Sequence, residues 1–167
     1  MKRTVLLILL LAFACVTKTT TGPDAFSYTD GESFRVQIPL ANKDGSKSKK
    51  DGTVTHEFRE KPAEDSVIVR VIVLETKSPE DLFAPGYESS FLSSCNCSVG
   101  KRGVIHVNTW AAREYVLTMK DGSRTAYERH IAVGKKIFVL GVFGPSDDDA
   151  RLASMFKTLT ESFAIKE

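Results

Sequence analysis

A series of strand-like segments between residues 113 and 143, joined by tight-turn sequences, constrains the fold more than any other part of the chain. Asp121-Gly122 is its strongest hairpin sequence, because both residue types tolerate the positive φ of a type I′ turn. Gly134-Lys135 marks a second tight turn. Between and after these turns, apolar residues either alternate with polar ones or form a continuous run. The pattern predicts an antiparallel meander with strands at 113–119, 124–133 and 137–143.

A long amphipathic helix is predicted directly after this meander. Gly144-Pro145 ends the last strand, and Ser146 is a candidate N-cap. The three aspartates at 147–149 favour the helix dipole, which explains them without a cation site. Apolar side chains then recur at helical spacing, at Leu152, Met155, Phe156, Leu159 and Phe163. We expect this stripe to pack on the sheet rather than to dock a partner.

The first half of the chain also predicts β-structure. Residues 26–38 alternate around Asp30-Gly31 and predict an opening hairpin. Residues 53–60 predict a mostly polar strand. Residues 67–74 form a β-branched run typical of a central strand covered on both faces, and its one charge, Arg70, needs an edge position or a partner.

A helical segment joins the two β-rich halves. Ser78 is a candidate N-cap for a helix that starts at Pro79, and Pro85-Gly86 interrupts this helix before a short helical piece at 87–94. Residues 95–103 are predicted to be a loop. The strand period returns at 104–107.

Residues 1–14 have the three parts of an export signal. Lys2 and Arg3 form a positive n-region, residues 5–13 form an apolar h-region, and Ala12-Phe13-Ala14 supplies small residues at the cleavage site. The apolar run is shorter than the roughly 20 residues that cross a bilayer core. We therefore predict a cleaved signal peptide rather than a retained anchor.

Cys15 directly follows Leu11-Ala12-Phe13-Ala14, which resembles the bacterial lipobox. The resemblance implies that Cys15 is acylated and becomes the first mature residue. Two or three acyl chains anchor a protein stably, because each buried methylene contributes about 0.8 kcal/mol. Ala-x-Ala also suits ordinary cleavage after Ala14, so a plain secreted domain is the alternative.

These patterns divide the chain into three parts: a signal peptide at 1–14, a lipidated N-terminus and polar tether at 15–24, and a single domain at 25–167. Val16, rather than Asp, follows the cysteine and resembles the outer-membrane sorting pattern of Gram-negative cells. We therefore predict a membrane-anchored lipoprotein that faces the periplasm or the exterior.

Charge argues against a nucleic-acid partner. The chain has 23 Lys and Arg against 21 Asp and Glu, but Lys2 and Arg3 belong to the predicted signal peptide, so the mature chain is neutral. The polar stretch at 42–52 holds four lysines. Two aspartates dilute their charge and no aromatic residue is interleaved, so a solvated hairpin loop is the expected structure.

Several segments of the domain match a known pattern: Phe26-x-Tyr28, residues 31–39, residues 129–140, Gly144-Pro145 and the helix closing on Ser162-Phe163. With these segments the domain resembles the PsbP-like group, which includes photosystem extrinsic subunits, a small eukaryotic Ran-binding protein and many uncharacterised bacterial lipoproteins. The resemblance covers about residues 25–165. It implies an α+β fold, an antiparallel sheet flanked by helices in an α/β/α sandwich. It also implies a scaffold for binding and assembly without a shared catalytic site.

Cys95 and Cys97 are the one remaining pair of residues suited to chemistry. Exported thiols usually pair, which favours a local disulfide. Unpaired cysteines, pairing with another chain, and a redox or metal role are the alternatives. Adding His106 gives three soft ligands, but their spacing matches no standard zinc site.

Other candidate residues have ordinary structural explanations. His56, His106 and His130 lie on separate predicted strands, where a histidine is usually a surface or packing residue. Trp110, Tyr87, Tyr115 and Tyr127 could line a groove for a peptide or glycan, although packing on a sheet also requires such residues. The sequence contains no G-x-S-x-G, H-E-x-x-H or phosphate-binding glycine motif.

From the sequence we expect no catalytic residue, no metal and no cofactor. The predicted function is binding or assembly of another envelope component by a lipid-anchored, non-catalytic domain. The alternatives are a small thiol/disulfide redox or metal-binding protein centred on Cys95 and Cys97, and a plain secreted domain.

Overall fold

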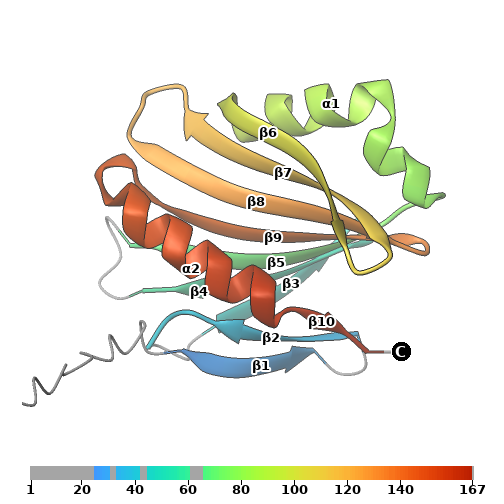
Figure 1. Ribbon diagram of the computed structural model, residues 1–167, viewed down its shortest axis with the longest axis horizontal. Coiled ribbons are helices and arrows are strands. Elements are labelled where there is room, and N and C mark those ends of the chain that lie inside the picture. Colours follow the sequence, from blue (N-terminus) through green and yellow to red (C-terminus); the bar gives the residue numbers. More distant parts are fainter. Residues whose placement is uncertain (1–24, 31–32, 42–44, 61–65, 167) are drawn as a thin grey trace, which may run out of the picture.

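A seven-stranded antiparallel sheet forms the centre of the computed structural model, which describes residues 25–30, 33–41, 45–60 and 66–166 (Figure 1). The strand order is β3-β4-β5-β9-β8-β7-β6. The strands are β3 (Gly45–Lys50), β4 (Thr53–Arg59), β5 (Ile68–Glu75), β6 (Cys97–Val107), β7 (Trp110–Met119), β8 (Arg124–Val133) and β9 (Lys136–Pro145). Every neighbouring pair is antiparallel.

Helices lie on both faces of this sheet (Figure 1). The 3₁₀ turn η2 (Ser146–Asp148) leads into α2 (Asp149–Ser162), which packs on one face, called here the α2 face. The 3₁₀ helix η1 (Pro79–Phe83) and α1 (Pro85–Cys95) pack on the other, the α1 face. The result is an α/β/α sandwich, as the sequence predicts.

A small second sheet completes the α2 face. It consists of β1 (Phe26–Asp30), β2 (Phe34–Ile38) and β10 (Ala164–Ile165), in the order β1-β2-β10. Phe34, Val36 and Ile38 of β2 are buried in the main core. The predicted opening hairpin is therefore confirmed, but it pairs with the C-terminal strand rather than with the main sheet.

Side chains that alternate along β9 contribute to the apolar layers on both faces of the main sheet. Phe138, Leu140 and Val142 of β9 are buried on the α2 face, while Ile137 and Val139 are buried on the α1 face. Full burial of each such side chain contributes about 1.5–3 kcal/mol. β9 is the middle strand of the seven, and it contributes buried side chains to both layers.

Close packing anchors the start of α2. A Cβ on Gly144 would lie 2.5 Å from Leu152 Cδ2, so only glycine lets the helix approach the sheet here. Leu152, Met155 and Leu159 are fully buried. The predicted apolar stripe of the helix is thus confirmed.

Two segments predicted to be loops are strands. Residues 97–103 belong to β6, which pairs with β7 along its whole length and accommodates a bulge between Val99 and Lys101. Residues 45–50 form the edge strand β3, whose side chains are all exposed. Both predictions were wrong because backbone pairing with a neighbour, which local polarity does not reveal, holds these polar edge strands.

Turn and cap details also differ from expectation. Both Asp51 and Gly52 have positive φ, as a type I′ turn requires, whereas at the predicted site only Gly122 does. Asp121 instead accepts hydrogen bonds from the Ser123 N–H and hydroxyl. Ser146 does not cap α2, since its Oγ is hydrogen-bonded to Thr125 Oγ1.

The segment between β5 and β6 contains two short helices, as predicted, but the second begins two residues earlier than expected. Ser78 caps η1 in a capping box with Asp81, as predicted. Pro85 is the first residue of α1 instead of a break within it.

The predicted signal peptide, Cys15 and the tether lie outside the described residues. In the part of the chain that the structure describes, no helix has both the length and the hydropathy required to cross a bilayer.

His56 joins the small sheet to the main one. It is fully buried on β4, and its Nδ1 lies 2.9 Å from Tyr28 Oη of β1. Its Nε2 lies 3.4 Å from Asp30 Oδ2, and the opposite oxygen of Asp30 binds Lys47 Nζ at 2.6 Å. Burial lowers the pKa of His56 below its ordinary value, although the Asp30 carboxylate opposes this effect.

The protein should therefore lose stability as the pH falls from 7.5 to 5.5. The unfolded chain binds a proton on His56 near the ordinary histidine pKa of about 6.5, and the native state does so only at lower pH. In His56→Gln the difference in unfolding free energy between these two pH values should be smaller than in the wild type. Urea denaturation measures it.

His106→Gln is the matched control, because this histidine is exposed on β6. The control should keep the wild-type pH dependence. If His56→Gln kept it as well, His56 would not be the group responsible.

Candidate functional site

Helix α1 covers only part of its sheet face. Phe91, Leu92 and Cys95 pack on the β6–β7–β8 side, against a cluster that includes Tyr115 and Leu117. Ile72 and Leu74 of β5 remain half-buried beside the helix. The expectation that residues 67–74 are covered on both faces is therefore wrong for the α1 face, because α1 is too short to cross the whole sheet.

The uncovered region forms the largest hollow described here, with a volume of about 620 Å³; we call it the α1 pocket. Its lining residues come from β4, β5, α1, β8 and β9: Thr53, Thr55, Arg70, Ile72, Leu74, Tyr87, Ser90, Phe91, Ser94, Cys95, Glu128, His130, Val139 and Phe143. The apolar part of the floor consists of Ile72, Leu74, Val139 and Phe143, and hydroxyl groups lie on β4 and on α1. This combination is typical of a binding site for a small molecule or a short segment.

A hydrogen-bonded chain of three side chains forms one end of this pocket. Tyr87 Oη lies 2.8 Å from His130 Nδ1, and His130 Nε2 lies 2.8 Å from Glu128 Oε2. His130 and Glu128 are 1% and 4% exposed. Glu128 and His130 share a face because they are two residues apart on β8, and Pro85 at the start of α1 places Tyr87 above them.

The order hydroxyl, imidazole, carboxylate resembles a nucleophile with its base and orienting acid. The hydroxyl is unsuited to that role. Burial, followed by the charges of Tyr115 and Glu128, raises the pKa of Tyr87 far above its ordinary value. A phenol that stays protonated at neutral pH is a weak nucleophile. The chain therefore serves best to fix α1 on the sheet.

A row of residues crosses the sheet beneath the pocket. Glu57, Arg70, Gly141 and Glu128 are consecutive register partners on β4, β5, β9 and β8. Arg70 Nε donates to Glu57 Oε2 at 2.6 Å. The sequence prediction that Arg70 has a partner is confirmed.

Arg70 also lowers the pKa of Glu57 and contacts an aromatic ring. Burial acts to raise the pKa of Glu57, but the hydrogen bonds and charges of Arg70 and Arg59 outweigh it and lower that pKa. The Arg70 guanidinium lies 5.0 Å from the centre of the Phe143 ring. It is thus held at one side of the pocket by a carboxylate and an aromatic face.

Cys95 and Cys97 flank the C-terminus of α1. Their sulfurs lie at bonding distance and their Cα atoms are 5.3 Å apart, while Asn96 between them adopts the left-handed conformation. Cys97 is 7% exposed, and Cys95 lines the rim of the α1 pocket. This geometry suits a local disulfide between α1 and β6. The disulfide itself stays a prediction.

The histidines do not converge on one site. His56 lies on the α2 face, His130 on the α1 face, and His106 is exposed on β6. Within the described ranges, no group of three or more His, Cys, Asp or Glu side chains is placed to hold a metal ion. His56 and His130 are packing residues with specific polar partners.

The four aromatic residues that were candidates to line one groove lie in different places. Tyr87 lines the α1 pocket, Tyr127 lies on the α2 face, and Tyr115 is buried beneath α1. Trp110 is half-buried against the main core. They do not form one continuous aromatic surface.

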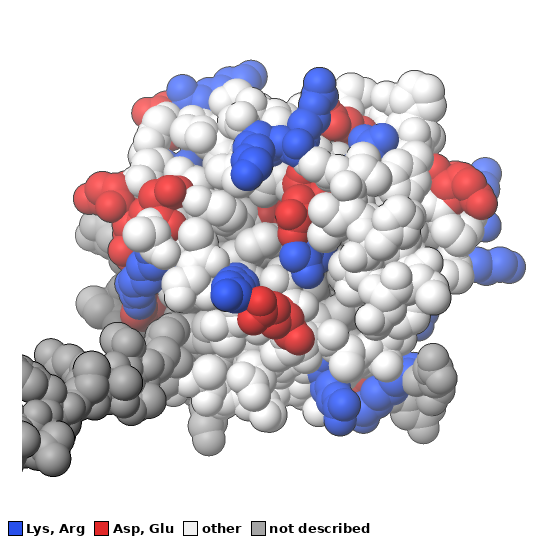
Figure 2. Space-filling model, viewed as in Figure 1, with Lys and Arg blue, Asp and Glu red and all other residues white. Residues whose placement is uncertain are grey.

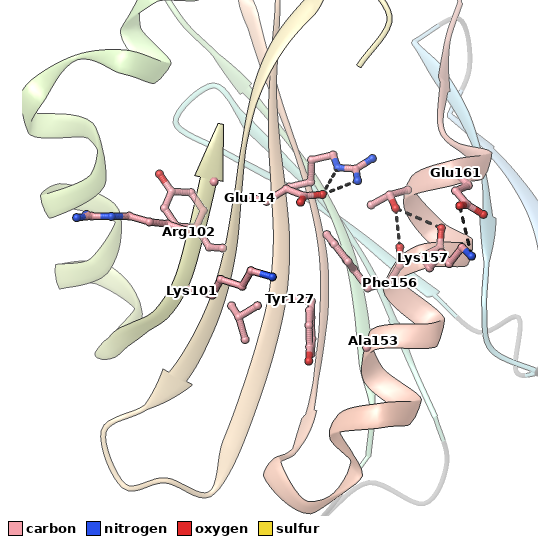
Figure 3. Close-up of a pocket in the computed structure, with 13 residues that line it drawn as sticks. Lys101, Arg102, Glu114, Tyr127, Ala153, Phe156, Lys157 and Glu161 are labelled. Atoms are coloured by element: carbon pink, nitrogen blue, oxygen red, sulfur yellow. Dashed lines mark hydrogen bonds and ion pairs between the residues drawn. The ribbon is translucent and has the colours of Figure 1, made fainter. Parts of the chain in front are cut away.

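A second hollow, the α2 pocket, lies between α2 and β6–β8 and has a volume of about 360 Å³ (Figure 3). Tyr127 and Phe156 line it, and Lys101 points into it. Arg129 Nε donates to Glu114 Oε1 at 2.8 Å. Burial, then the hydrogen bond to Asp149, raises the pKa of Tyr127 to about 12.

Both carboxylates of the α2 pocket are paired with cations that also line it, Glu114 with Arg129 and Glu161 with Lys157. Figure 2 shows Lys and Arg interspersed with Asp and Glu on this face, without a broad surface of one sign. The α1 pocket is larger and holds the more deeply buried polar groups. We take it as the candidate functional site. No sequence motif marked it, because its residues come from five separate elements.

Comparison with solved structures defines the class of fold. The structure is similar to cyanobacterial PsbP from Synechocystis, with a TM-score of 0.55 and 15% identity over 86% of this chain and 93% of that chain. The fold is PsbP-like, as the sequence motifs imply. At this identity the similarity establishes the fold alone.

Two further structures are similar at a lower level. A protein of unknown function from Pseudomonas aeruginosa has a TM-score of 0.46 and 17% identity, over 80% of this chain and 91% of that chain. A protein from Bacteroides thetaiotaomicron has a TM-score of 0.43 and 12% identity, over 80% and 45%. No protein-family model and no curated protein sequence matches the chain.

Removing the Tyr87 hydroxyl should weaken the attachment of α1. Tyr87→Phe leaves buried His130 Nδ1 without its partner, so the unfolding free energy should fall by about 1–3 kcal/mol. Chemical denaturation measures this change.

Tyr127→Phe is the control, because its hydroxyl bonds Asp149 at an exposed position. Its cost should be about 0.5 kcal/mol or less. Equal costs for the two variants would contradict a special role for the buried chain.

Proposed function

We propose that this chain is an exported, lipid-anchored protein of the cell envelope whose domain binds another envelope component without catalysing a reaction. The binding role rests on one observation, the open α1 pocket, which combines apolar and charged side chains on one sheet face. The polar groups at its end hold one another in place, and the phenol among them is not activated. A preformed hollow with fixed walls is suited to binding.

The anchor rests on the lipobox-like sequence that ends at Cys15. Nine residues, 16–24, join this cysteine to the first described residue, Ala25. A chain of this length spans at most about 30 Å when fully extended. The proposed lipid would therefore keep the domain, and its pocket, close to a membrane surface.

A thiol/disulfide role is the second candidate. It is favoured by the position of Cys95 at the rim of the α1 pocket. The burial of Cys97 disfavours it, because a redox-active thiol needs access to its partners.

Lipidation is tested by growing the native host with a radiolabelled fatty acid. The wild type should carry the label and sediment with membranes, whereas Cys15→Ala should lose both properties because it lacks the acceptor thiol. Cys95→Ser/Cys97→Ser should keep the label, which controls for labelling at other cysteines. An unlabelled wild type would exclude the anchor, and its recovery in the medium would favour the secreted alternative.

Thiol titration with mass measurement tests the redox candidate. Protein isolated from the envelope should contain a Cys95–Cys97 disulfide and no alkylatable thiol. The Cys95→Ser/Cys97→Ser variant should complement a strain that lacks the protein as well as the wild type does. A mixed population of reduced and oxidised protein, together with failed complementation, would instead support redox function.

A further inference from the structure

Glu128 is a buried carboxylate whose hydrogen bonding is incomplete. Its side chain is 5% exposed, and Oε2 is bound by His130 Nε2. Oε1 makes no hydrogen bond with the described residues and is not among their buried unpaired atoms, so it is accessible from the pocket that Glu128 lines. No Lys or Arg of these residues forms an ion pair with Glu128. Among the described residues, the ion-pair partner of Glu128 is His130, which is charged only when protonated, so an ammonium group from a ligand would add an attractive charge at Oε1.

Arg70 offers the opposite charge on the other side of the pocket. Its Nε is used by Glu57, and the two terminal nitrogens have no hydrogen-bond partner in the described part of the chain. The side chain is 33% exposed and lines the α1 pocket. The guanidinium edge can therefore receive a carboxylate, for which its planar geometry is well suited.

Gly141 separates the two charges. It is the register partner of both Arg70 and Glu128, so these residues stand two strand spacings, about 10 Å between Cα atoms, apart. A Cβ at this position would lie 2.7 Å from the Phe143 ring and 3.5 Å from Glu128 Cγ. Glycine thus lets the Phe143 ring lie against the sheet between Arg70 and Glu128, and a ligand that reaches both charges must pass over this ring.

The opposite face of the sheet provides a contrast. Arg129 and Glu114 lie on neighbouring strands and bind each other directly. Arg70 and Glu128 have a strand between them and make no ion pair with each other. The aliphatic side chains of Ile72 and Leu74 extend the pocket beside these charges.

We propose that the α1 pocket binds a zwitterionic ligand, a free amino acid or a short peptide with an aliphatic side chain. Its ammonium group pairs with Glu128, its carboxylate pairs with Arg70, and its side chain packs on Ile72 and Leu74. This assignment rests on the proposed binding function and names the ligand class for the same pocket.

Isothermal titration of the mature chain in detergent tests this assignment with four probes. They are L-leucine, the dipeptide leucyl-leucine, isopentylamine, which lacks the carboxylate, and 4-methylpentanoate, which lacks the ammonium group. At least one zwitterion should bind about tenfold or more tightly than either singly charged analogue. Tighter binding of leucine indicates a free amino acid as the ligand, and tighter binding of the dipeptide indicates a peptide.

Two charge variants test the two ends of the ligand separately. Glu128→Gln should weaken binding of the zwitterion and of isopentylamine by about tenfold or more, and leave 4-methylpentanoate unchanged. Arg70→Gln should show the opposite selectivity. Glu114→Gln and Arg129→Gln remove the charges of the pair on the α2 face and should have no effect.

A substitution at an exposed position of α1 tests the pocket without changing a buried residue. Ser90 is exposed on α1 and lines the pocket, whereas Ser93 is exposed on α1 but lies outside it. Ser90→Trp should abolish zwitterion binding by filling the pocket, and Ser93→Trp should not. Both variants should keep the wild-type unfolding midpoint.

Equal affinity for the zwitterions and their singly charged analogues would overturn the assignment, as would wild-type binding by both charge variants. If this happened while Cys15 was still labelled, the lipid-anchored role would stand without this ligand class. Loss of labelling with retained zwitterion binding would overturn the anchor and leave the ligand assignment in place.

Discussion

Burial of the α2 face of the central sheet is the interaction on which the rest of the structure depends. Helix α2 and strand β2 cover the β5 and β9 side chains there, and Phe34, Leu152 and Met155 are fully buried at the contact. This layer supplies most of the apolar burial, so the other face need not be fully covered. The open α1 pocket is possible because stability is concentrated on the opposite face.

The α1 face has a different organisation. Helix α1 is held by apolar contacts at its Phe91 end and by the hydrogen-bonded chain from Tyr87 to Glu128. Buried polar groups fix orientation more strictly than apolar contacts do, because each group needs a particular partner. The same chain leaves one carboxylate oxygen facing the pocket, so the groups that position α1 also shape the candidate site.

Sequence patterns predicted most strands, the apolar stripe of α2 and the PsbP-like fold. They failed where polar edge strands were involved: Lys47 lies in a strand, and so does Arg102. Alternation reports burial, and an edge strand with exposed side chains shows little of it. The pocket was missed for a related reason, since Arg70, Gly141 and Glu128 are distant in sequence and meet only through strand register.

By itself the sequence determined the local preferences: the turns at Gly122 and Gly134, the helical period after Ser146 and the export-like pattern that ends at Cys15. These depend on residues near one another in the chain. Only the tertiary structure decided that His130 would be buried between a tyrosine and a glutamate, and that α1 would stop short of β5. Long-range packing sets burial and register, and these in turn determine which charges are left to meet a ligand.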